Sequence, residues 1–521
     1  MHPLYCLTED ALMLNRSLLG SAIVLASSYA AATPYMPMDA RGLAMGNTGV
    51  ASAKLAHAPA YNPSLLSQAE SNDNFALLFP QVGVNLADEA ELFDTADYLD
   101  EEVIPEFDSL FDDGASDSLP TAIDNLNAAA DQLQSDLGGP NQAASNQALK
   151  NEIANTQDAV SRLNSSVNEL DSSLQTISGN PVRGRLGLAA GLAVPNDVLA
   201  FAISARVDGN VSARTLYSGS DSTLLTSYAP AASGYLDAAS ALTDAVDDND
   251  ASAANDAYTA LDNYTSDDIE LDNGTTQIFQ GGELSDSASD PALNSRVQVV
   301  AVAIAEVGLS LSREFMIADR AIAIGLTPKL QQVATYHYVG QIDEEDNSPD
   351  IELEDSERTS NHINLDIGTS FYVDPKERLR VGIVIQDLIS KDFEYADVPV
   401  DGDADGEVAE GGKVSLKPKL RAGVAYTRDW YNLAADLDLV ENEALAFEDP
   451  TQYLSVGGEV DLAGWAQLRA GLRTNLAGDS NVVSIGAGVS PFGVHFDLAA
   501  MMDISEPEKE LGLALETGFY F

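Results

Sequence analysis

The chain has 521 residues, with 26 Lys and Arg against 82 Asp and Glu, so its formal net charge is −56 at pH 7. This excess of carboxylates excludes nucleic-acid binding, which needs clustered Lys and Arg to neutralise phosphates, and disfavours adhesion to an anionic membrane surface. Apolar residues make up 45% of the chain, which is enough for a large folded core.

The first residues have the pattern of a secretory signal peptide. A short basic segment precedes an apolar run over 17–28, and small residues at 30–32 offer a cleavage site. We expect residues 1–32 to be a signal peptide, with Met13 as an alternative start. Cys6, the single cysteine, lies in this segment, so the mature chain would have neither a disulfide nor a thiolate metal site.

Alternation of polar and apolar residues dominates the rest of the chain. After the signal segment no apolar run is long enough for a spanning helix, whereas 467–473 (Gln-Leu-Arg-Ala-Gly-Leu-Arg) alternates as a strand with one polar and one apolar face does. About 14 such segments occur, an even number as in bacterial barrels. They lie near 74–85, 183–194, 198–216, 295–312, 319–339, 361–373, 378–390, 416–428, 431–440, 452–461, 464–474, 481–490, 493–502 and 510–521.

The connections between these segments alternate between tight turns, such as 490–493, and longer acidic loops, such as 341–358 and 398–412. Short periplasmic turns and long external loops are typical of outer-membrane barrels, whereas a soluble β-sandwich does not require this parity. We therefore predict an all-β transmembrane barrel over 74–521, with about 14 antiparallel strands in contact with lipid. Its location would be the outer membrane of a Gram-negative bacterium.

The C-terminal segment ends in alternate apolar residues that include Phe519 and Phe521. This pattern resembles the closing strand that the barrel-assembly machinery reads, so we expect that machinery to be a partner.

Period-two alternation also predicts which charged residues face the lumen, because a charge on the lipid face at the midplane costs about 2–4 kcal/mol. These charges would form a polar conduit or gate, or an ion-paired interior that fills the barrel. Inward glycines such as Gly423, Gly471, Gly486 and Gly488 would leave room there. The predicted lumen-facing residues are Arg185, Asp366, Arg380, Lys419, Arg421, Asp436, Asp438, Glu459, Asp461, Arg469, Arg473 and Glu516.

A family resemblance lies near the mature N-terminus. Residues 38–47 read Met-Asp-Ala-Arg-Gly-Leu-Ala-Met-Gly-Asn, and 60–64 read Ala-Tyr-Asn-Pro-Ser. This resembles the opening of FadL-type outer-membrane barrels, which include hydrophobic-compound channels. The whole chain resembles the outer-membrane group named for conjugal-transfer TraF. The lack of a mature cysteine excludes the thioredoxin-like protein of the same name.

The resemblance implies a small N-terminal hatch, residues 33–73, inside a 14-stranded barrel. It places Asn62, Pro63 and Ser64 at the gate, with Ser64 where Ala is usual. Similarity is strong over 38–86 and general over 183–521, and it leaves out the two insertions described next.

Both insertions connect predicted strands on the external side. In 115–180, apolar residues recur at coiled-coil spacing over 119–137 and 143–177, which predicts an antiparallel helical hairpin. A second insertion, 231–265, is Ala-rich, acidic and predicted to be helical. These helices would form either a surface that contacts a partner or a lid on the barrel mouth.

Metal and enzymatic signals are sparse. Asp401, Asp403 and Asp405 open an Asp-x-Asp-x-Asp-Gly sequence as in calcium loops, but Gly412 occupies the twelfth position where an EF-hand needs Glu. A solvated acidic loop is the simpler interpretation. The five histidines form no His-x-x-x-His spacing, and no Gly-x-Ser-x-Gly elbow occurs, so we expect neither a cofactor nor enzymatic activity.

Two hypotheses follow for function. In the first, the barrel is a hatch-gated channel for a hydrophobic or amphiphilic small molecule. In the second, the helical insertions act as a structural or interaction component in conjugation or envelope assembly and contact a surface partner.

Overall fold

The structure is a computed structural model. It describes residues 36–69, 74–88, 90–111, 118–196, 198–271, 274–285, 294–317, 320–341, 353–402, 406–442, 445–447, 450–462, 464–490 and 493–520. The predicted signal peptide, Asp403, Asp405 and Phe521 therefore lie outside the described residues.

Fourteen antiparallel strands close into a barrel in the described chain, which confirms the predicted fold class. The first strand, β1, pairs with both β2 and the last strand, β22, so the sheet has no free edge. In order around the barrel the strands are β1 (Ala76–Ala87), β2 (Pro181–Val194), β3 (Ala200–Leu216), β8 (Arg296–Ile317), β9 (Arg320–Gln341), β10 (Arg358–Tyr372), β11 (Leu379–Gln386), β16 (Lys419–Arg428), β17 (Tyr431–Asp438), β18 (Tyr453–Leu462), β19 (Ala466–Asn475), β20 (Asn481–Val489), β21 (Val494–Asp503) and β22 (Glu510–Tyr520).

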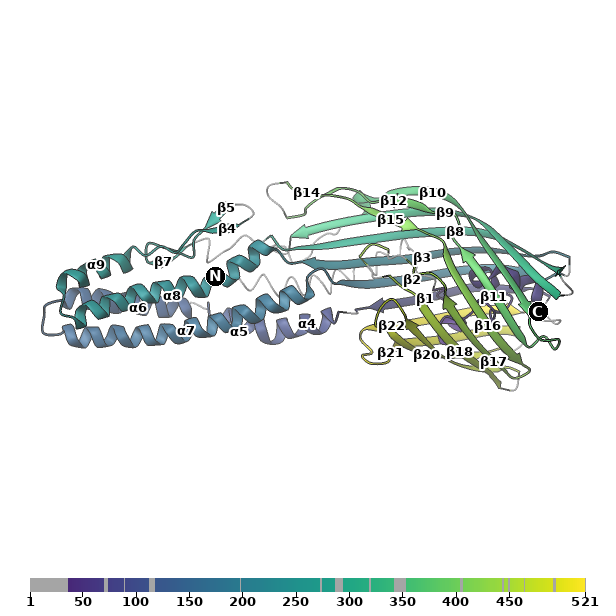
Figure 1. Ribbon diagram of the computed structural model, residues 1–521, viewed down its shortest axis with the longest axis horizontal. Coiled ribbons are helices and arrows are strands. Elements are labelled where there is room, and N and C mark those ends of the chain that lie inside the picture. Colours follow the sequence, from purple (N-terminus) through teal and green to yellow (C-terminus); the bar gives the residue numbers. More distant parts are fainter. Residues whose placement is uncertain are drawn as a thin grey trace.

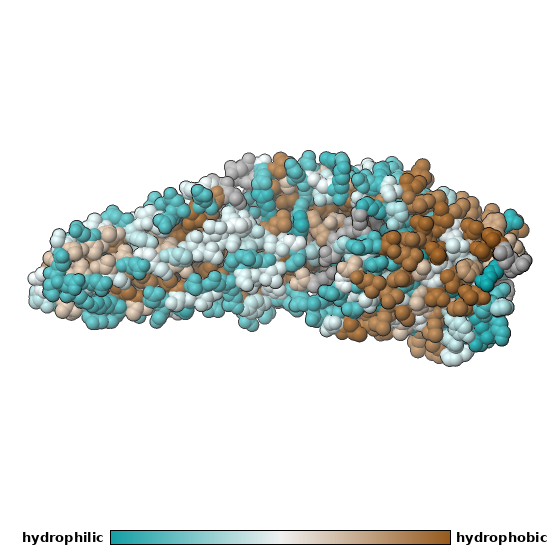
Figure 2. All heavy atoms as spheres, in the orientation of Figure 1, coloured by the Kyte–Doolittle hydropathy of each residue, from teal (hydrophilic) through white to brown (hydrophobic). Residues whose placement is uncertain are grey.

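The outer surface of the barrel carries a belt of exposed apolar side chains. On β22, Leu511, Leu513 and Leu515 are exposed, while the residues between them are buried. Trp430 and Trp465 are exposed at two of the short turns. Figure 2 shows the apolar side chains gathered on the barrel, at the end away from the helices. An outward apolar band flanked by aromatic residues is the lipid-facing surface of a membrane barrel.

No helix in the described part of the chain is both long and apolar enough to cross a membrane.

One wall of the barrel is much longer than the other. Strands β8 and β9 have 22 residues each, whereas β11 and β17 have eight. The predicted strand 378–390 ends early, at Gln386, because Asp387 adopts a positive φ of 54°. A small sheet, β12 (Lys391–Glu394) with β15 (Lys413–Leu416), then packs on the long wall.

Three smaller elements accompany this wall. The hairpin β13 (Val398–Pro399) with β14 (Val408–Ala409) packs near the end of β9, and the short helix η3 (Leu353–Ser356) covers Tyr336 of β9.

A helical stalk projects from the end of the barrel where the long connections lie (Figure 1). Its helices share one hydrophobic core that includes Leu126, Leu163 and Tyr235. The two insertions, separate in sequence, therefore form one body. The stalk consists of α4 (Leu92–Tyr98), the π-helix η2 (Leu99–Val103), α5 (Ile104–Ser109), α6 (Leu119–Asp136), α7 (Gln142–Ile177), α8 (Gly219–Asp247), α9 (Ala251–Asp262) and the hairpins β4 (Ile269–Leu271)–β5 (Gly274–Thr276) and β6 (Phe279–Gln280)–β7 (Glu283–Leu284).

The second insertion is helical over a longer range than the predicted 231–265. Helix α8 begins at Gly219, because the Ser218 hydroxyl accepts a hydrogen bond from the backbone N–H of Ser220 and caps the helix.

The N-terminal segment lies inside the barrel, and we call the described residues 36–69 the hatch (Figure 1). It contains α2 (Ala40–Ala44), α3 (Ala58–Tyr61) and the 3-10 helix η1 (Pro63–Gln68). Nearly all of its residues are buried. Asp39 caps α2 by accepting a 2.6 Å hydrogen bond from Gly42 N.

Candidate functional site: the hatch and the lumen

Inward glycines let the hatch backbone lie directly on the barrel wall. A Cβ added to Gly471 would lie 2.1 Å from Gly46 N, and one added to Gly457 would lie 2.3 Å from Met45 O. At Gly325 a Cβ would lie 2.3 Å from Ser64 N. Such close approach of two backbones excludes any side chain. The room that the inward glycines were expected to leave is filled by the hatch at Gly423, Gly471 and Gly486; Gly488 instead borders Asp497 and Arg469.

Asn62 joins three parts of the site. Its Oδ1 accepts a 3.1 Å hydrogen bond from Ser64 N and lies 2.7 Å from Ser64 Oγ. Its Nδ2 donates to Val50 O at 2.9 Å and to Thr369 O of β10 at 3.3 Å. The side chain thus caps η1, ties two hatch segments together and attaches them to the wall.

Pro63 and Ser64 follow at the start of η1. Proline suits this position because its missing N–H would have no partner in the helix. Ser64 Oγ lies 2.8 Å from Ser370 Oγ of β10. The predicted gate residues therefore sit at a contact between the hatch and the barrel.

Buried charges hold the middle of the hatch. Asp436 Oδ2 accepts hydrogen bonds from Gly49 N at 2.7 Å and Val50 N at 3.0 Å. Arg41 of the hatch donates to both oxygens of Glu459, at 3.0 and 3.2 Å. Charge-assisted hydrogen bonds of this kind are among the strongest in proteins.

Arginines of the wall complete these contacts by donating to hatch carbonyl groups. Arg380 Nε donates to Ala51 O at 2.7 Å, and Arg421 donates to Asn47 O at 3.3 Å while it pairs with Asp438. These guanidinium groups satisfy backbone oxygens that would otherwise be buried without a partner.

Two further arginines form ion pairs in this part of the lumen. Arg469 pairs with Glu459 at 2.7 Å and with Asp497. Arg473 donates to Asn47 Oδ1 at 3.1 Å and pairs with Glu510 at 2.5 Å.

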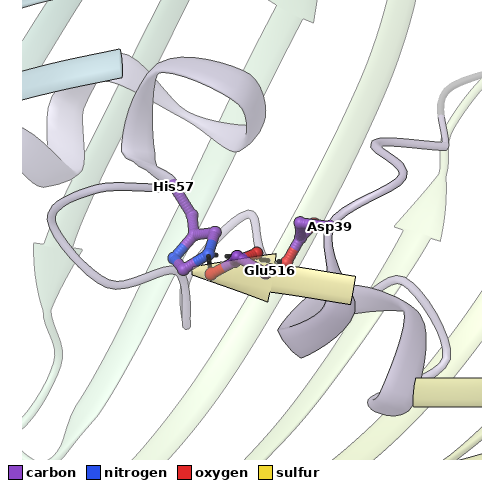
Figure 3. A group of neighbouring side chains, drawn as sticks. All are labelled: Asp39, His57 and Glu516. Carbon is purple, nitrogen blue, oxygen red and sulfur yellow. Dashed lines mark hydrogen bonds and ion pairs between the residues drawn. The ribbon is translucent and has the colours of Figure 1, made fainter. Parts of the chain in front are cut away.

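His57 points one ring nitrogen toward two carboxylates, one from the hatch and one from the wall (Figure 3). Its Nε2 is 2.7 Å from Glu516 Oε1 and 3.8 Å from Asp39 Oδ1, and Tyr61 OH donates to Asp39 Oδ2 at 2.5 Å. Burial lowers the pKa of the His57 imidazole, but the carboxylates of Glu516 and Asp39 outweigh burial and raise this pKa above its usual value. Sequence reasoning missed Asp39 and His57, because residues 18 apart in an irregular segment show no recognisable ligand spacing.

A second network of buried charges lies on the long wall. Lys329 Nζ is 2.9 Å from Asp387, 3.1 Å from Asp366 and 3.3 Å from Glu306. Lys419 pairs with the same Asp387 at 3.3 Å. Of this set the sequence analysis named only Asp366 and Lys419. The alternation of 295–312 and 319–339 was the signal that could have found Glu306 and Lys329.

The remaining predicted residues lie as follows. Arg185 is buried on β2 opposite Asn210 of β3. Asp461 is the penultimate residue of β18, where it is half-buried and accepts a 2.8 Å hydrogen bond from Gly464 N of the following turn, so its carboxylate bonds the turn and not the buried ion pairs of the lumen. Phe519 is paired with Leu77 of β1 and Val494 of β21. Asp401 accepts a 3.1 Å hydrogen bond from Tyr338 OH.

The mouth of the barrel at the stalk end contains a cleft of about 350 Å³. Its lining combines charged residues with apolar ones. The lining residues are Ala90, Asn180, Pro181, Arg183, Gly478, Asp479, Ser480, Asp503, Ser505 and Lys509.

A closed strand order, an apolar outer belt and a plugged polar lumen define a membrane-spanning β-barrel with an internal hatch. The family model described as F plasmid transfer operon, TraF, protein matches residues 59–438. The chain belongs to this family, which confirms the family prediction. No curated protein matches the chain.

Solved structures of barrel transporters align over nearly the whole chain. The toluene transporter TbuX of Ralstonia pickettii aligns at 10% identity over 94% of this chain and 99% of that one, with a TM-score of 0.45. The monoaromatic hydrocarbon channel CymD aligns at 11% identity over the same shares, with a TM-score of 0.44. The toluene transporter TodX of P. putida aligns at 10% identity over 94% and 99%, with a TM-score of 0.41.

Proposed function

We propose that the protein is a hatch-gated channel of the outer membrane that admits a hydrophobic or amphiphilic small molecule. The observation that carries this proposal is the hatch itself. A segment of 34 residues, 36–69, lies within a closed barrel whose wall carries glycines where the two backbones approach most closely. A barrel that served only as a membrane anchor would not require a separate plug seated on such a surface.

The chemistry of the contacts between the hatch and the wall favours a movable plug. The hatch is held by hydrogen bonds and ion pairs such as Gly49–Asp436 and Arg41–Glu459. Polar contacts can be exchanged for water as a segment moves, so their net contribution is modest, about 0.5–3 kcal/mol each.

The cleft at the stalk-end mouth of the barrel favours an amphiphilic solute. It places Arg183, Lys509, Asp479 and Asp503 beside Ala90 and Pro181, so one lining offers both charged groups and apolar surface. An amphiphile with a polar head would use both.

A reversible disulfide between the hatch and the wall tests the gating. Ser64 Oγ and Ser370 Oγ are 2.8 Å apart, so the variant S64C/S370C, with Cys6→Ser, brings two thiols within reach of a disulfide. Uptake of radiolabelled oleate and of toluene is measured in Gram-negative cells that lack their own channels for these compounds. We expect uptake of at least one probe to be about 10-fold slower in the oxidised variant and to recover after reduction.

A matched control forms a disulfide within the wall. Ser310 Oγ and Thr327 Oγ are 2.8 Å apart on β8 and β9, so S310C/T327C should show the same uptake in both redox states. Equal uptake by oxidised and reduced S64C/S370C would overturn gating by the hatch. If cells with the natural protein took up neither probe faster than cells without it, the transport proposal itself would fail.

The second hypothesis, a role in conjugation or envelope assembly, is tested by mating efficiency in strains that carry the chain without its stalk. The family description names a plasmid transfer operon, but no contact in the described residues favours that role over transport, and we do not propose it.

A further inference from the structure

The cluster of Asp39, His57 and Glu516 has the composition of a metal site. One ligand atom of each side chain lies within 4.8 Å of the other two, and all three residues are buried. Figure 3 shows the three side chains pointing toward one another, two from the hatch and one from β22. An imidazole nitrogen with two carboxylates is a ligand set that divalent zinc and similar ions accept.

Unsatisfied polar atoms point to a missing ligand. Glu516 is 1% exposed and His57 4% exposed. Among the described residues, Glu516 Oε2 has no hydrogen-bond partner; His57 Nδ1 has none either, but it is the ring nitrogen that contacts neither carboxylate. Buried polar atoms are rarely left without a partner, and a cation held by both oxygens of Glu516 would satisfy Oε2.

The charges and the distances also suit a divalent ion. With a neutral imidazole, the carboxylates of Asp39 and Glu516 supply two negative charges, which one divalent cation balances. The ligand atoms of a tetrahedral zinc site are about 3.3 Å apart, given metal–ligand distances near 2.0–2.1 Å. The separations from His57 Nε2, 2.7 Å to Glu516 Oε1 and 3.8 Å to Asp39 Oδ1, lie on either side of this value.

We propose that Asp39, His57 and Glu516 bind one divalent transition-metal ion, with Zn²⁺ as the reference ion, and that the ion fastens the hatch to the closing strand of the barrel. Water would fill the fourth position. Tyr61 supports the site from outside, because its hydroxyl donates to Asp39 Oδ2; Asp39 Oδ1 accepts from Gly42 N at 2.6 Å and offers its second lone pair toward His57. This inference rests on the seated hatch and not on transport, so the two proposals fail separately.

Metal binding to the full-length protein tests this site. Protein purified from outer membranes in detergent is stripped with a chelator and titrated with Co²⁺, followed by visible absorption, and with Zn²⁺, followed by calorimetry. We expect one ion per chain and the absorption bands of four-coordinate cobalt. His57→Ala and Glu516→Gln should bind at least about 100-fold more weakly, and Tyr61→Phe about 10- to 100-fold more weakly, as for outer partners of metal ligands.

The matched control is His362→Ala, which removes a histidine whose Nε2 bonds Ile389 O, away from the cluster. This variant should bind as tightly as the natural chain. Heat-modifiable migration in detergent gels shows whether each variant has folded, and Tyr61→Phe keeps the ring, so it provides a test if His57→Ala does not fold. Folded protein that takes up no stoichiometric Zn²⁺ or Co²⁺, or equal binding by His57→Ala and His362→Ala, would overturn the site and leave the cluster as an ion pair.

Discussion

A single carboxylate oxygen of Asp436 holds two consecutive backbone N–H groups of the hatch, those of Gly49 and Val50. Both residues are buried, so bulk solvent does not reach these donors in the seated hatch. The hatch thus depends on individual wall atoms, and the loss of one such atom leaves two buried donors without a partner.

Asp436→Ala should loosen the hatch without opening the barrel wall. Hydrogen bonds to a charged group contribute about 1.5–3 kcal/mol each, so we expect the amides of Gly49 and Val50 to exchange with deuterium at least about 30-fold faster. Hydrogen-exchange mass spectrometry of the detergent-solubilised protein measures this rate. Asp461→Ala removes an acid that bonds only a turn amide of its own strand connection and should leave hatch exchange unchanged. Unchanged exchange in Asp436→Ala would show that other contacts suffice.

Two adjacent glycines on β18 offer a matched pair of substitutions. Gly457 faces the hatch, and an added Cβ would lie 2.3 Å from Met45 O, whereas a Cβ on Gly458 would lie 3.3 Å from the Leu433 side chain and 3.8 Å from Asn432 O. Gly457→Ala should displace the hatch and raise the ionic conductance of the protein in planar bilayers several-fold, while Gly458→Ala should behave as the natural chain. Equal conductance in the two variants would contradict a close seat at Gly457.

At the scale of elements, the strands could be predicted because each carries its own signal. Alternation on β19 or β22 follows directly from one face in lipid and one in the lumen. Strand ends were less predictable, since β11 stops where Asp387 turns its N–H toward the Asp366 carboxylate at 2.9 Å, a contact between residues that the sequence does not relate.

The sequence predicts which charged residues face the lumen, but it does not predict all of their ion-pair partners. Arg421 pairs with Asp438 and Arg469 with Glu459, as neighbouring strands suggest. Arg473 of β19, however, pairs with Glu510 at the start of β22, three strands further along the sheet. Such partners depend on the curvature of the barrel and on the hatch inside it, and local periodicity reveals neither.

The stalk core should respond to substitution as a soluble helical bundle does. Leu163 of α7 is fully buried in it, while the next residue, Asn164, is exposed. Leu163→Ala should cost about 2–5 kcal/mol and lower the midpoint of a thermal transition followed by the helical circular dichroism signal, with Asn164→Ala as the unaffected control. Loss of the strand signal at the same lowered temperature would instead show that stalk and barrel unfold together.

At the scale of the whole molecule, each insertion of the stalk joins the barrel through two strand ends that are already neighbours, and Leu92 and Phe93 of α4 pack against the barrel strands there. Ala87 of β1 is paired with Arg183 of β2, and Leu216 of β3 with Arg296 of β8. A short Gly-rich loop can therefore replace each insertion without moving a strand. The apolar faces of α7 and α8 bury one another within one core, so the insertions are energetically coupled although each closes its own loop.

This coupling predicts a non-additive deletion series. Replacing 92–179 alone leaves the apolar face of α8 without α7, and replacing 218–294 alone leaves α7 without α8, so each single deletion should aggregate and reach the membrane in reduced amount. The double deletion removes the whole exposed core and should restore heat-modifiable barrel to near the natural amount, with the hatch contacts and solute uptake retained within about two-fold. Quantitative gels of outer-membrane fractions, with uptake measured per folded barrel, give both readouts. A double deletion that accumulates less barrel than either single deletion would show that the stalk assists assembly of the barrel beneath it.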